Sequence, residues 1–398
     1  MRLTVDTKAF ADTVNWIARS LPSNPPVPVL AGIKLTATGD TVEAVGFDYE
    51  LVSHAVLDAD VAGDGTVLLP GRLLADITRR LPNGPLQLVL EDATCVLTSS
   101  RSTFTLQTLP LDDYPDLPDP PDEVGSMTAE AFATAVTQTA VAAGHDSTVP
   151  MLTGLRMELT PSQIAFAATD RFRLAAAARE WQPTSEDTKA DLVVPAAALT
   201  ALVKSIGRDV EHITLGLNRS GTDEDSVATN LSITAGSRTL RIRLFDDCFI
   251  KWRAVLPAEF AASVLADAGE LAAAVRRVAT VAERLTPVRL TCTPGSEPDG
   301  GEIELQAWDG DTATGRETLP AELVTGTEPF TIALSPGYLL DALATLSTDR
   351  ACLRTTGPHK PVVILAASPE AHAEDLPGGG EPAPGDHRYL LMPIRTSS

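Results

Sequence analysis

The sequence predicts an α+β protein built from three repeated domains. One observation is a phrase that occurs twice, VPVLAG at residues 27–32 and VPMLTG at residues 149–154. Another is that the same order of patterns (helix, strands, helix, strands) occurs three times along the 398 residues. A sequence pattern that recurs in a fixed order indicates one structural unit used several times. We therefore expect domains at residues 1–123, 124–257 and 258–398.

Each repeat begins with the pattern of an amphipathic helix. Apolar side chains recur three or four residues apart, which places them on one helical face. They are Phe10, Val14, Ile17 and Leu21 in the first repeat, Phe132, Val136 and Ala140 in the second, and Leu271, Val275, Val278 and Ala282 in the third. A strand is expected to follow each helix, starting at Pro28, Pro150 and Pro287.

The rest of each repeat is also predicted from matching segments. An acidic turn joins two strands at 47–55, 169–177 and 308–317, and a second helix follows within 68–81, 193–206 and 333–346. Proline lies near the start of each second helix, where its missing N–H costs no hydrogen bond. Strands end the repeats at 102–110, 238–247 and 388–395.

Two arrangements of the repeats remain open. They could form separate domains on a string, or neighbours could share a continuous sheet by pairing their last strands. The stretch EDLPGGGEPAPGD at 374–386 predicts a mobile loop before the final strand.

Composition excludes several classes of protein. The sequence has no run of 18 apolar residues and no apolar leader after MRLTVDTKAF, so we expect no membrane partner and no signal peptide. Its four cysteines form no CxxC pair, which fits a cytoplasmic protein without a disulfide framework. The formal net charge of -22 argues against nucleic acid, unless the basic residues gather on one face.

The sequence contains none of the usual catalytic motifs, and we expect no enzyme, cofactor or metal. Asp112–Asp113 and Asp246–Asp247 occupy matching places in two repeats. Paired carboxylates can act as acid and base, but matching positions in repeats are more typical of a solvated turn. A metal-dependent enzyme that uses Asp246–Asp247 or Asp309–Asp311 remains a further hypothesis.

Basic residues recur on or beside the predicted helices. They provide either a solubilising face or one shared surface for phosphates. They are Lys8, Arg19, Arg72, Arg79, Arg80, Lys204, Arg208, Arg276 and Arg277.

Taken together, the motifs resemble the β subunit of bacterial DNA polymerase III, the sliding clamp, in its actinobacterial form. The phrases that carry the resemblance are VPVLAG, FDYE, RSTFTLQTLPLDDYPDLP, TDRFRLA, AERLTPVRL and YLLMPIR, in order along the whole chain. The resemblance implies DNA-clamp domains with helices inside and sheets outside. It also implies a head-to-tail homodimeric ring around duplex DNA, with the basic helix residues facing phosphates.

The resemblance further implies a peptide-binding groove between the second and third domains. Its partners would be the DNA polymerase III alpha subunit, the clamp loader and other proteins with a clamp-binding motif. The expected groove residues are Leu152, Thr169, Arg171, Phe172, Arg173, Leu174, Leu285, Ser335, Tyr338, Pro361, Leu390, Met392, Pro393, Ile394 and Arg395. Arg173 and Arg395 are expected to bond peptide carbonyls or an acidic residue. The expected dimer interface contains Arg101, Phe104, Leu106, Ala279 and Thr280.

One segment departs from the family pattern. FDDCFIKWRAVLP has Ile250 where the family usually has proline, Cys248 is added, and Ala254 replaces an arginine found in some members. An alternative function is therefore a duplicated, specialised clamp that gives self-resistance to an antibiotic aimed at the groove.

Overall fold

The computed structural model describes residues 1–146, 148–207, 209–220, 227–246, 248–282, 286–295, 300–309, 313–325, 328–368, 370–371, 376 and 378–395. Contacts within the chain define two compact units. Unit 1 comprises Met1–Glu130, Trp181–Thr188 and Ala201–Leu244, and unit 2 comprises Ala131–Glu180, Lys189–Thr200 and Phe245–Ser398. The second repeat thus contributes to both units.

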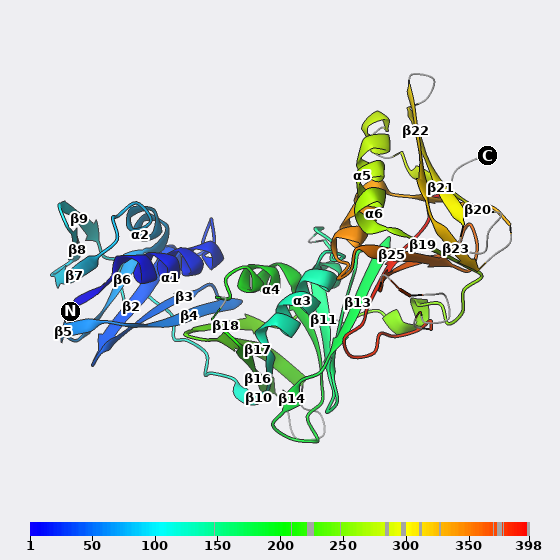
Figure 1. The fold of residues 1–398 in the computed structure, drawn as a ribbon. Helices are drawn as coiled ribbons and strands as arrows, with labels where there is room; N and C mark the ends of the chain where they lie inside the picture. Colours follow the sequence, from blue (N-terminus) through cyan, green and yellow to red (C-terminus); the bar gives the residue numbers. More distant parts are fainter. Residues whose placement is uncertain are drawn as a thin grey trace. The chain divides into compact units, whose positions relative to one another are not determined.

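Unit 1 contains two antiparallel sheets (Figure 1). One has the order β5-β1-β7-β8-β9, formed by β1 (Arg2–Asp6), β5 (Asp60–Gly63), β7 (Pro85–Glu91), β8 (Thr94–Ser99) and β9 (Ser102–Gln107). The other has the order β14-β10-β16-β17-β18-β4-β3-β2-β6. Its strands are β2 (Gly32–Thr38), β3 (Thr41–Phe47), β4 (Leu51–Asp58), β6 (Gly65–Pro70), β10 (Asp122–Thr128), β14 (Gln182–Pro183), β16 (His212–Ser220), β17 (Val227–Ala235) and β18 (Arg238–Arg243).

The helices of unit 1 confirm the predicted amphipathic pattern. Helix α1 (Thr7–Ser20) begins where the Asp6 carboxylate accepts a hydrogen bond from the Ala9 amide at 2.9 Å. It packs on β3, β4 and α2 (Gly71–Thr78), and its predicted apolar residues Phe10, Val14 and Ile17 are fully buried. Each such side chain contributes about 1.5–3 kcal/mol.

The strand expected from Pro28 begins four residues later. Residues Pro28–Ala31 form a 3₁₀ turn, closed by the Leu30 amide donating to the Val27 carbonyl at 3.1 Å, and β2 starts at Gly32. The second repeat behaves in the same way, with a 3₁₀ turn at Pro150–Thr153 before β11. Proline lacks the N–H that a strand would use, so the phrase forms a turn and not the first residues of a strand.

Unit 2 repeats the plan. One sheet has the order β15-β11-β12-β13-β27-β26-β25-β19-β23, and the other has the order β22-β21-β20-β24. The first consists of β11 (Gly154–Leu159), β12 (Ile164–Thr169), β13 (Arg173–Arg179), β15 (Ala190–Pro195), β19 (Ala262–Asp267), β23 (Glu322–Thr325), β25 (Arg350–Thr355), β26 (Val362–Ala367) and β27 (His387–Leu391). The second consists of β20 (Val288–Pro294), β21 (Gly301–Asp309), β22 (Ala313–Pro320) and β24 (Phe330–Leu334).

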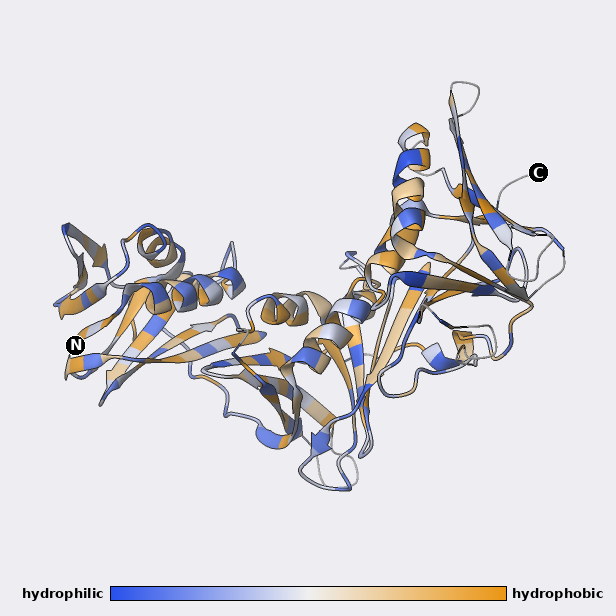
Figure 2. Cartoon of the chain, in the orientation of Figure 1, coloured by the Kyte–Doolittle hydropathy of each residue, from blue (hydrophilic) through white to orange (hydrophobic). Residues whose placement is uncertain are grey.

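The remaining helices are α3 (Ala129–Ala140), α4 (Ala196–Val203), α5 (Ala268–Val278) and α6 (Pro336–Ala344), with 3₁₀ turns at Trp252–Val255 and Ala279–Val281. Helix α5 carries hydrophobic and hydrophilic residues on different sides (Figure 2), and Leu271, Val275 and Val278 are buried as predicted. It ends at Val278, so Ala282 lies beyond the helix. Among the described residues, no helix is long and apolar enough to cross a membrane.

Strand pairing decides between the two arrangements of the repeats. Within unit 1, β18 of the second repeat pairs with β4 of the first, and within unit 2, β27 of the third repeat pairs with β13 of the second. Neighbouring repeats therefore share continuous sheets and are not independent beads.

The described part of the segment 374–386 is packed and hydrogen-bonded, which corrects the prediction of a mobile loop there. Leu376 is buried in the core beside Trp252, and the Gly380 amide donates to the Pro257 carbonyl at 3.0 Å. At the other end, the Gly385 amide donates to the Ala178 carbonyl at 2.9 Å. The polar composition hides these backbone bonds, which fix the loop; residues 374, 375 and 377 lie outside the described part.

Candidate functional site

The turn between β12 and β13 in unit 2 is the centre of the candidate site. The Asp170 carboxylate accepts hydrogen bonds from the Phe172 and Arg173 amides, each at 3.0 Å. Arg171, between them, has a positive φ of 79°. This side-chain-capped turn forms locally, because an aspartate can bond amides two and three residues ahead. It projects Arg171 and Phe172 outward, and Phe172 is 62% exposed.

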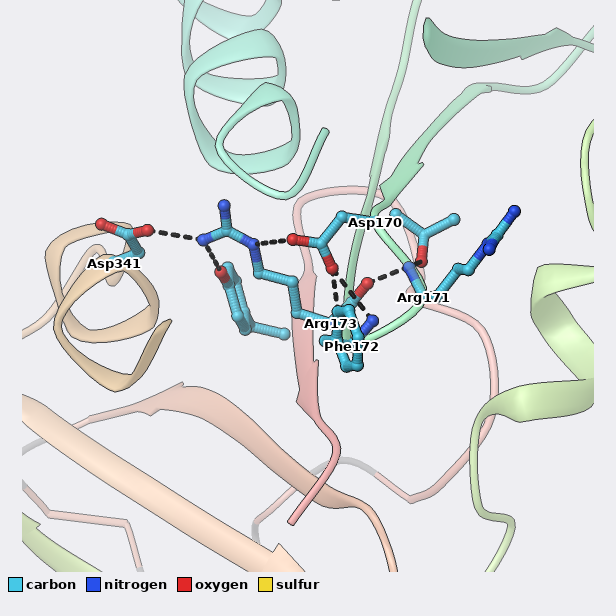
Figure 3. Close-up of polar contacts among 7 residues, drawn as sticks. Asp170, Arg171, Phe172, Arg173 and Asp341 are labelled. Atoms are coloured by element: carbon cyan, nitrogen blue, oxygen red, sulfur yellow. Dashed lines mark hydrogen bonds and ion pairs between the residues drawn. The ribbon is translucent and has the colours of Figure 1, made fainter. Parts of the chain in front are cut away.

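Arg173 is held by several contacts inside unit 2. Its side chain is 6% exposed and lies between two carboxylates and a phenol (Figure 3). Nε donates to Asp170 at 2.9 Å, and Nη1 donates to Asp341 on α6 at 2.5 Å and to the Tyr389 hydroxyl at 3.0 Å. The guanidinium also lies 4.3 Å from the centre of the Tyr338 ring.

These contacts shift the pKa values of Arg173 and Tyr389. Burial alone would lower the pKa of Arg173, but its interactions with Tyr389, Asp341 and Asp170 outweigh burial and raise the pKa. Burial raises the pKa of the Tyr389 phenol. Arg173 is thus a fixed cation that joins the turn to α6 and β27. It orders the wall of the site through Nε and Nη1. A contact between Arg173 and a bound peptide stays a prediction.

The end of the chain supplies the second half of the candidate site. After β27, the Met392 amide donates to the Phe172 carbonyl at 2.9 Å, and the Ile394 amide donates to the Ala333 carbonyl at 2.8 Å. In an extended segment, alternate side chains share a face. Met392 and Ile394 are accordingly both exposed, at 41% and 38%. We call Phe172, Met392 and Ile394 the apolar patch.

The other expected groove residues fall into three groups. The buried ones are Leu152, Thr169, Leu174 and Leu390. Partly buried ones are Ser335, Tyr338, Pro361 and Pro393, and Arg171 and Arg395 are exposed. Leu285 lies outside the described residues.

Unit 1 contains the same backbone arrangement with different side chains. The Asp48 carboxylate accepts from the Glu50 and Leu51 amides at 3.0 and 2.7 Å, Tyr49 has a φ of 73°, and the Arg243 amide donates to the Glu50 carbonyl at 2.8 Å. The equivalents of Phe172 and Met392 are therefore Glu50 and Arg243. Their side chains form an exposed ion pair at 3.5 Å.

A basic hollow of about 810 Å³ lies in unit 1. The expected DNA-facing residues Arg19, Arg72, Arg79 and Lys204 all line it, and so does Arg238, which the sequence did not single out. Arg238 donates to the Ser205 carbonyl at 2.9 Å and lies 5.3 Å from the Trp16 ring centre. It belongs to a strand, so a search confined to helices missed it.

The other expected DNA-facing residues are more dispersed. Lys8 is exposed on α1, and Arg80 donates to the Asp76 carbonyl on α2. On α5, Arg276 is exposed, whereas Arg277 pairs with Glu317 of β22 through contacts of 2.5 and 3.0 Å. Arg208 lies outside the described residues.

The expected dimer residues lie at sheet edges. Arg101 precedes β9, Phe104 is 38% exposed on β9, and Leu106 on the same strand is buried. Strand β9 ends the sheet β5-β1-β7-β8-β9. Ala279 and Thr280 follow α5 in a 3₁₀ turn that packs against β22, the last strand of its own sheet.

The acidic pairs give no metal cluster in the part of the chain that the structure describes. Asp112, Asp113 and Asp246 are exposed. No group of three or more His, Cys, Asp or Glu side chains among the described residues could hold a metal ion. Asp247 and Asp311 lie outside that part, as does the side chain of Asp309.

Comparison with known proteins places this architecture in a class. Three family models cover most of the chain: the N-terminal, central and C-terminal domains of the DNA polymerase III beta subunit match residues 1–118, 126–250 and 253–376. The fold is therefore a three-domain DNA clamp. The chain belongs to the DNA polymerase III beta subunit family.

Individual relatives agree. The chain is 37% identical to the beta sliding clamp of Streptomyces coelicolor over 397 residues, covering 100% of both sequences. It is 34% identical to the beta sliding clamp homolog GriR of Streptomyces muensis, covering 99% of both. The fold matches Pseudomonas aeruginosa DNA polymerase III subunit beta with a TM-score of 0.84 at 23% identity. It matches a griselimycin-bound sliding clamp from the same organism with a TM-score of 0.86 at 22% identity. Both matches cover 100% of each chain.

Proposed function

We propose that this chain is a DNA sliding clamp. It encircles duplex DNA without reading sequence and tethers the replicative polymerase and other proteins through a peptide-binding surface. It works in the cytoplasm and catalyses no reaction. Its clamp domains are 1–123, 124–257 and 258–398, and two chains join head to tail into a ring.

The apolar patch of unit 2 carries the proposal. Three large apolar side chains stand exposed together, where burial would remove them from water at roughly 25 cal/mol per Å². The fold does not require them, because unit 1 holds the same backbone arrangement with Glu50 and Arg243 in two of these places. An exposed apolar patch beside a rigid turn suits a short extended peptide with aliphatic or aromatic anchors.

The basic hollow supports the DNA part of the proposal. Five cationic side chains face it, against Asp12 and Asp76, in a chain of net charge -22. Such local concentration attracts phosphates while the acidic remainder repels DNA elsewhere. The charge of Arg277 is already matched by Glu317, so we assign this residue to the β22 edge and not to DNA.

Edge strands support the dimer. Strands β9 and β22 each end a sheet within the described chain, and unpaired edges favour pairing with another strand. Phe104 on β9 and the Ala279–Thr280 turn beside β22 would then lie across the interface between two chains.

A peptide titration tests the function. The probe is a fluorescent peptide from the clamp-binding motif of the host replicative polymerase, and the proteins are the full chain, a chain that ends before Met392, and the variant Arg243→Ala. We expect binding by the full chain and by Arg243→Ala, and loss of binding on truncation. Absence of binding by the intact dimer would contradict the tethering role.

A second function has its own support. The chain is similar to the homolog GriR, and a solved relative is bound to griselimycin. In this chain Ile250 packs on the core cluster that contains Leu174 and Leu390, and its carbonyl accepts a bond from Arg156 at 3.3 Å. The chain could thus be a specialised copy whose altered segment at 248–254 excludes an antibiotic from the peptide surface.

Competition separates the two functions. If the chain is a specialised copy, griselimycin should fail to displace the bound peptide, and Ile250→Pro should restore displacement. A second, less divergent clamp gene in the same genome would agree with this. Displacement from the unmodified chain at ordinary concentrations would exclude resistance at this surface.

A further inference from the structure

The basic hollow of unit 1 brings together cations that the chain itself does not neutralise. It is lined from α1, α2, the segment after α4 and β18 by five cationic side chains and two carboxylates. Asp76 pairs with Arg79 at 2.7 Å. No carboxylate in the described part of the chain lies within 4 Å of the other four cationic groups, which belong to Arg19, Arg72, Lys204 and Arg238. The hollow is therefore positive in a chain of net charge -22.

Two of these guanidinium groups are held in place by neutral partners. Arg72 Nη2 donates to the Leu21 carbonyl at 3.0 Å, and Arg238 Nη1 donates to the Ser205 carbonyl at 2.9 Å. The Arg238 guanidinium also lies 5.3 Å from the Trp16 ring centre. A guanidinium has several N–H donors, so a bond to a single carbonyl leaves most of them, and the whole charge, for a ligand.

The electrostatics of Arg238 favour a further anion in the hollow. Burial lowers the pKa of Arg238, the charges of Asp12 and Asp209 raise it, and the charge of Arg19 lowers it again. The net shift is downward, so the acids of the chain do not outweigh burial and the like charge of Arg19. An anion bound beside Arg19 and Arg238 would offset both unfavourable effects.

Unit 2 shows that the fold does not require this hollow. On β27, His387 holds the place that Arg238 holds on β18. Gln138 of α3 donates to the Thr345 carbonyl at 3.1 Å, and the Gln138 carbonyl lies 3.2 Å from His387 Nε2. All three unit 2 residues are buried. The polar groups of unit 2 thus satisfy one another, whereas those of unit 1 surround an open hollow.

The volume of the hollow limits what can fill it. About 810 Å³ lies in the range of small-molecule sites and is too small to admit a DNA duplex, which could only touch the rim. Trp16 is the aromatic side chain that lines the hollow, but it is 7% exposed and the Arg238 guanidinium lies over its ring. The described lining therefore offers charge for phosphates and no open aromatic face for a nucleobase.

We propose that the basic hollow is a binding site for a free inorganic oligophosphate, with tripolyphosphate as a suitable occupant. Each phosphoryl group accepts charge-assisted hydrogen bonds from arginine and lysine, and a short chain brings several negative charges into one hollow. The inference goes beyond the proposed clamp function and does not depend on it. In the clamp, the same cations would face DNA, so a bound oligophosphate would weaken the attraction for DNA.

Isothermal titration calorimetry with sodium tripolyphosphate, without DNA and at low salt, tests the site. The proteins are the full chain, Arg238→Met, Lys204→Ala and, as a matched control, Lys360→Ala, which removes an exposed lysine of unit 2. Thermal melting checks that each variant folds, and the exposed Lys204 decides the test if Arg238→Met does not fold. ATP, which carries the same triphosphate chain, is titrated to separate an inorganic ligand from a nucleotide.

We expect saturable binding of tripolyphosphate by the full chain. Arg238→Met should weaken it by about ten-fold and Lys204→Ala by about three-fold, because each removes a charge-assisted contact. Lys360→Ala should bind as the full chain does, and ATP should bind no more tightly than tripolyphosphate. Absence of binding, an equal loss in Lys204→Ala and Lys360→Ala, or tighter binding of ATP would overturn the proposal. Failure of the full chain to bind DNA would contradict the clamp function and leave this site in place.

Discussion

Replacing Arg173 by methionine should destabilise the chain, because the change removes the guanidinium and its hydrogen bonds. Methionine keeps most of the buried apolar part of the side chain, so the loss reports on the charged group. The Asp170 oxygen bonded to Nε and the buried Tyr389 hydroxyl would lose their partner. A buried hydrogen bond to a charged group is worth about 1.5–3 kcal/mol. The pair with Asp341 adds less, about 0.5–1 kcal/mol, because that carboxylate is 44% exposed. Two such bonds and this pair together lead us to expect that Arg173→Met lowers the free energy of unfolding by about 4 kcal/mol.

Asp341→Asn provides the matched comparison. It leaves Arg173 paired with Asp170, so it should cost only about 0.5–1 kcal/mol. The double variant should be about as stable as Arg173→Met alone. Once Arg173 is replaced, Asp341 no longer pairs with its guanidinium, so changing Asp341 removes no further interaction with it. Urea unfolding followed by tryptophan fluorescence measures all three, at one protein concentration because a dimer's stability depends on it.

The outcome that refutes this reasoning is a loss below about 1 kcal/mol for Arg173→Met, which would mean that the guanidinium is not holding the turn. A loss for Asp341→Asn as large as that for Arg173→Met would also contradict the assigned roles. Peptide affinity should fall with Arg173→Met, since the turn that carries Phe172 loses its tie to α6 and β27.

Three other results are expected. Burial lowers the pKa of His387 from 6.5 to about 3, so the unfolded chain takes up a proton at this residue before the folded chain does as the pH falls. The free energy of unfolding should therefore drop by about 2 kcal/mol between pH 7 and pH 5. Urea unfolding of His387→Gln should lack this pH dependence. A Cβ on Gly379 would lie 2.1 Å from the Pro257 carbonyl oxygen, whereas a Cβ on Gly378 would meet nothing within 4 Å. Gly379→Ala should therefore lower the free energy of unfolding by about 1–3 kcal/mol, and Gly378→Ala should leave it unchanged. Equal melting temperatures of the two variants would contradict the close packing of Gly379 against Pro257. Lys204→Ala should reduce the slope of log affinity for a short DNA duplex against log salt concentration by about 0.9, measured by fluorescence anisotropy. Arg277→Ala should leave this slope unchanged, because Arg277 already pairs with Glu317 of β22.

The sequence by itself determined the repeats, the helical faces and the turns. These features depend on residues close together in the chain. Phe10, Val14 and Ile17 are buried because helical spacing alone places them on one face. Asp48 and Asp170 cap their turns through amides only two or three residues ahead, so an aspartate at the matching place in FDYE and TDRF forms the same turn twice.

Only the tertiary structure decided what those turns present. The partners that hold Arg173 lie 168 and 216 positions away in the chain, and no local pattern announces them. Arg238 joins the basic hollow from a strand, and the loop before β27 is fixed by backbone bonds that its polar composition does not reveal. The exposed apolar patch likewise needs the end of the chain to lie beside a turn more than 200 residues earlier. Side-chain spacing fixes local structure, whereas long-range packing sets which groups remain free to meet a partner.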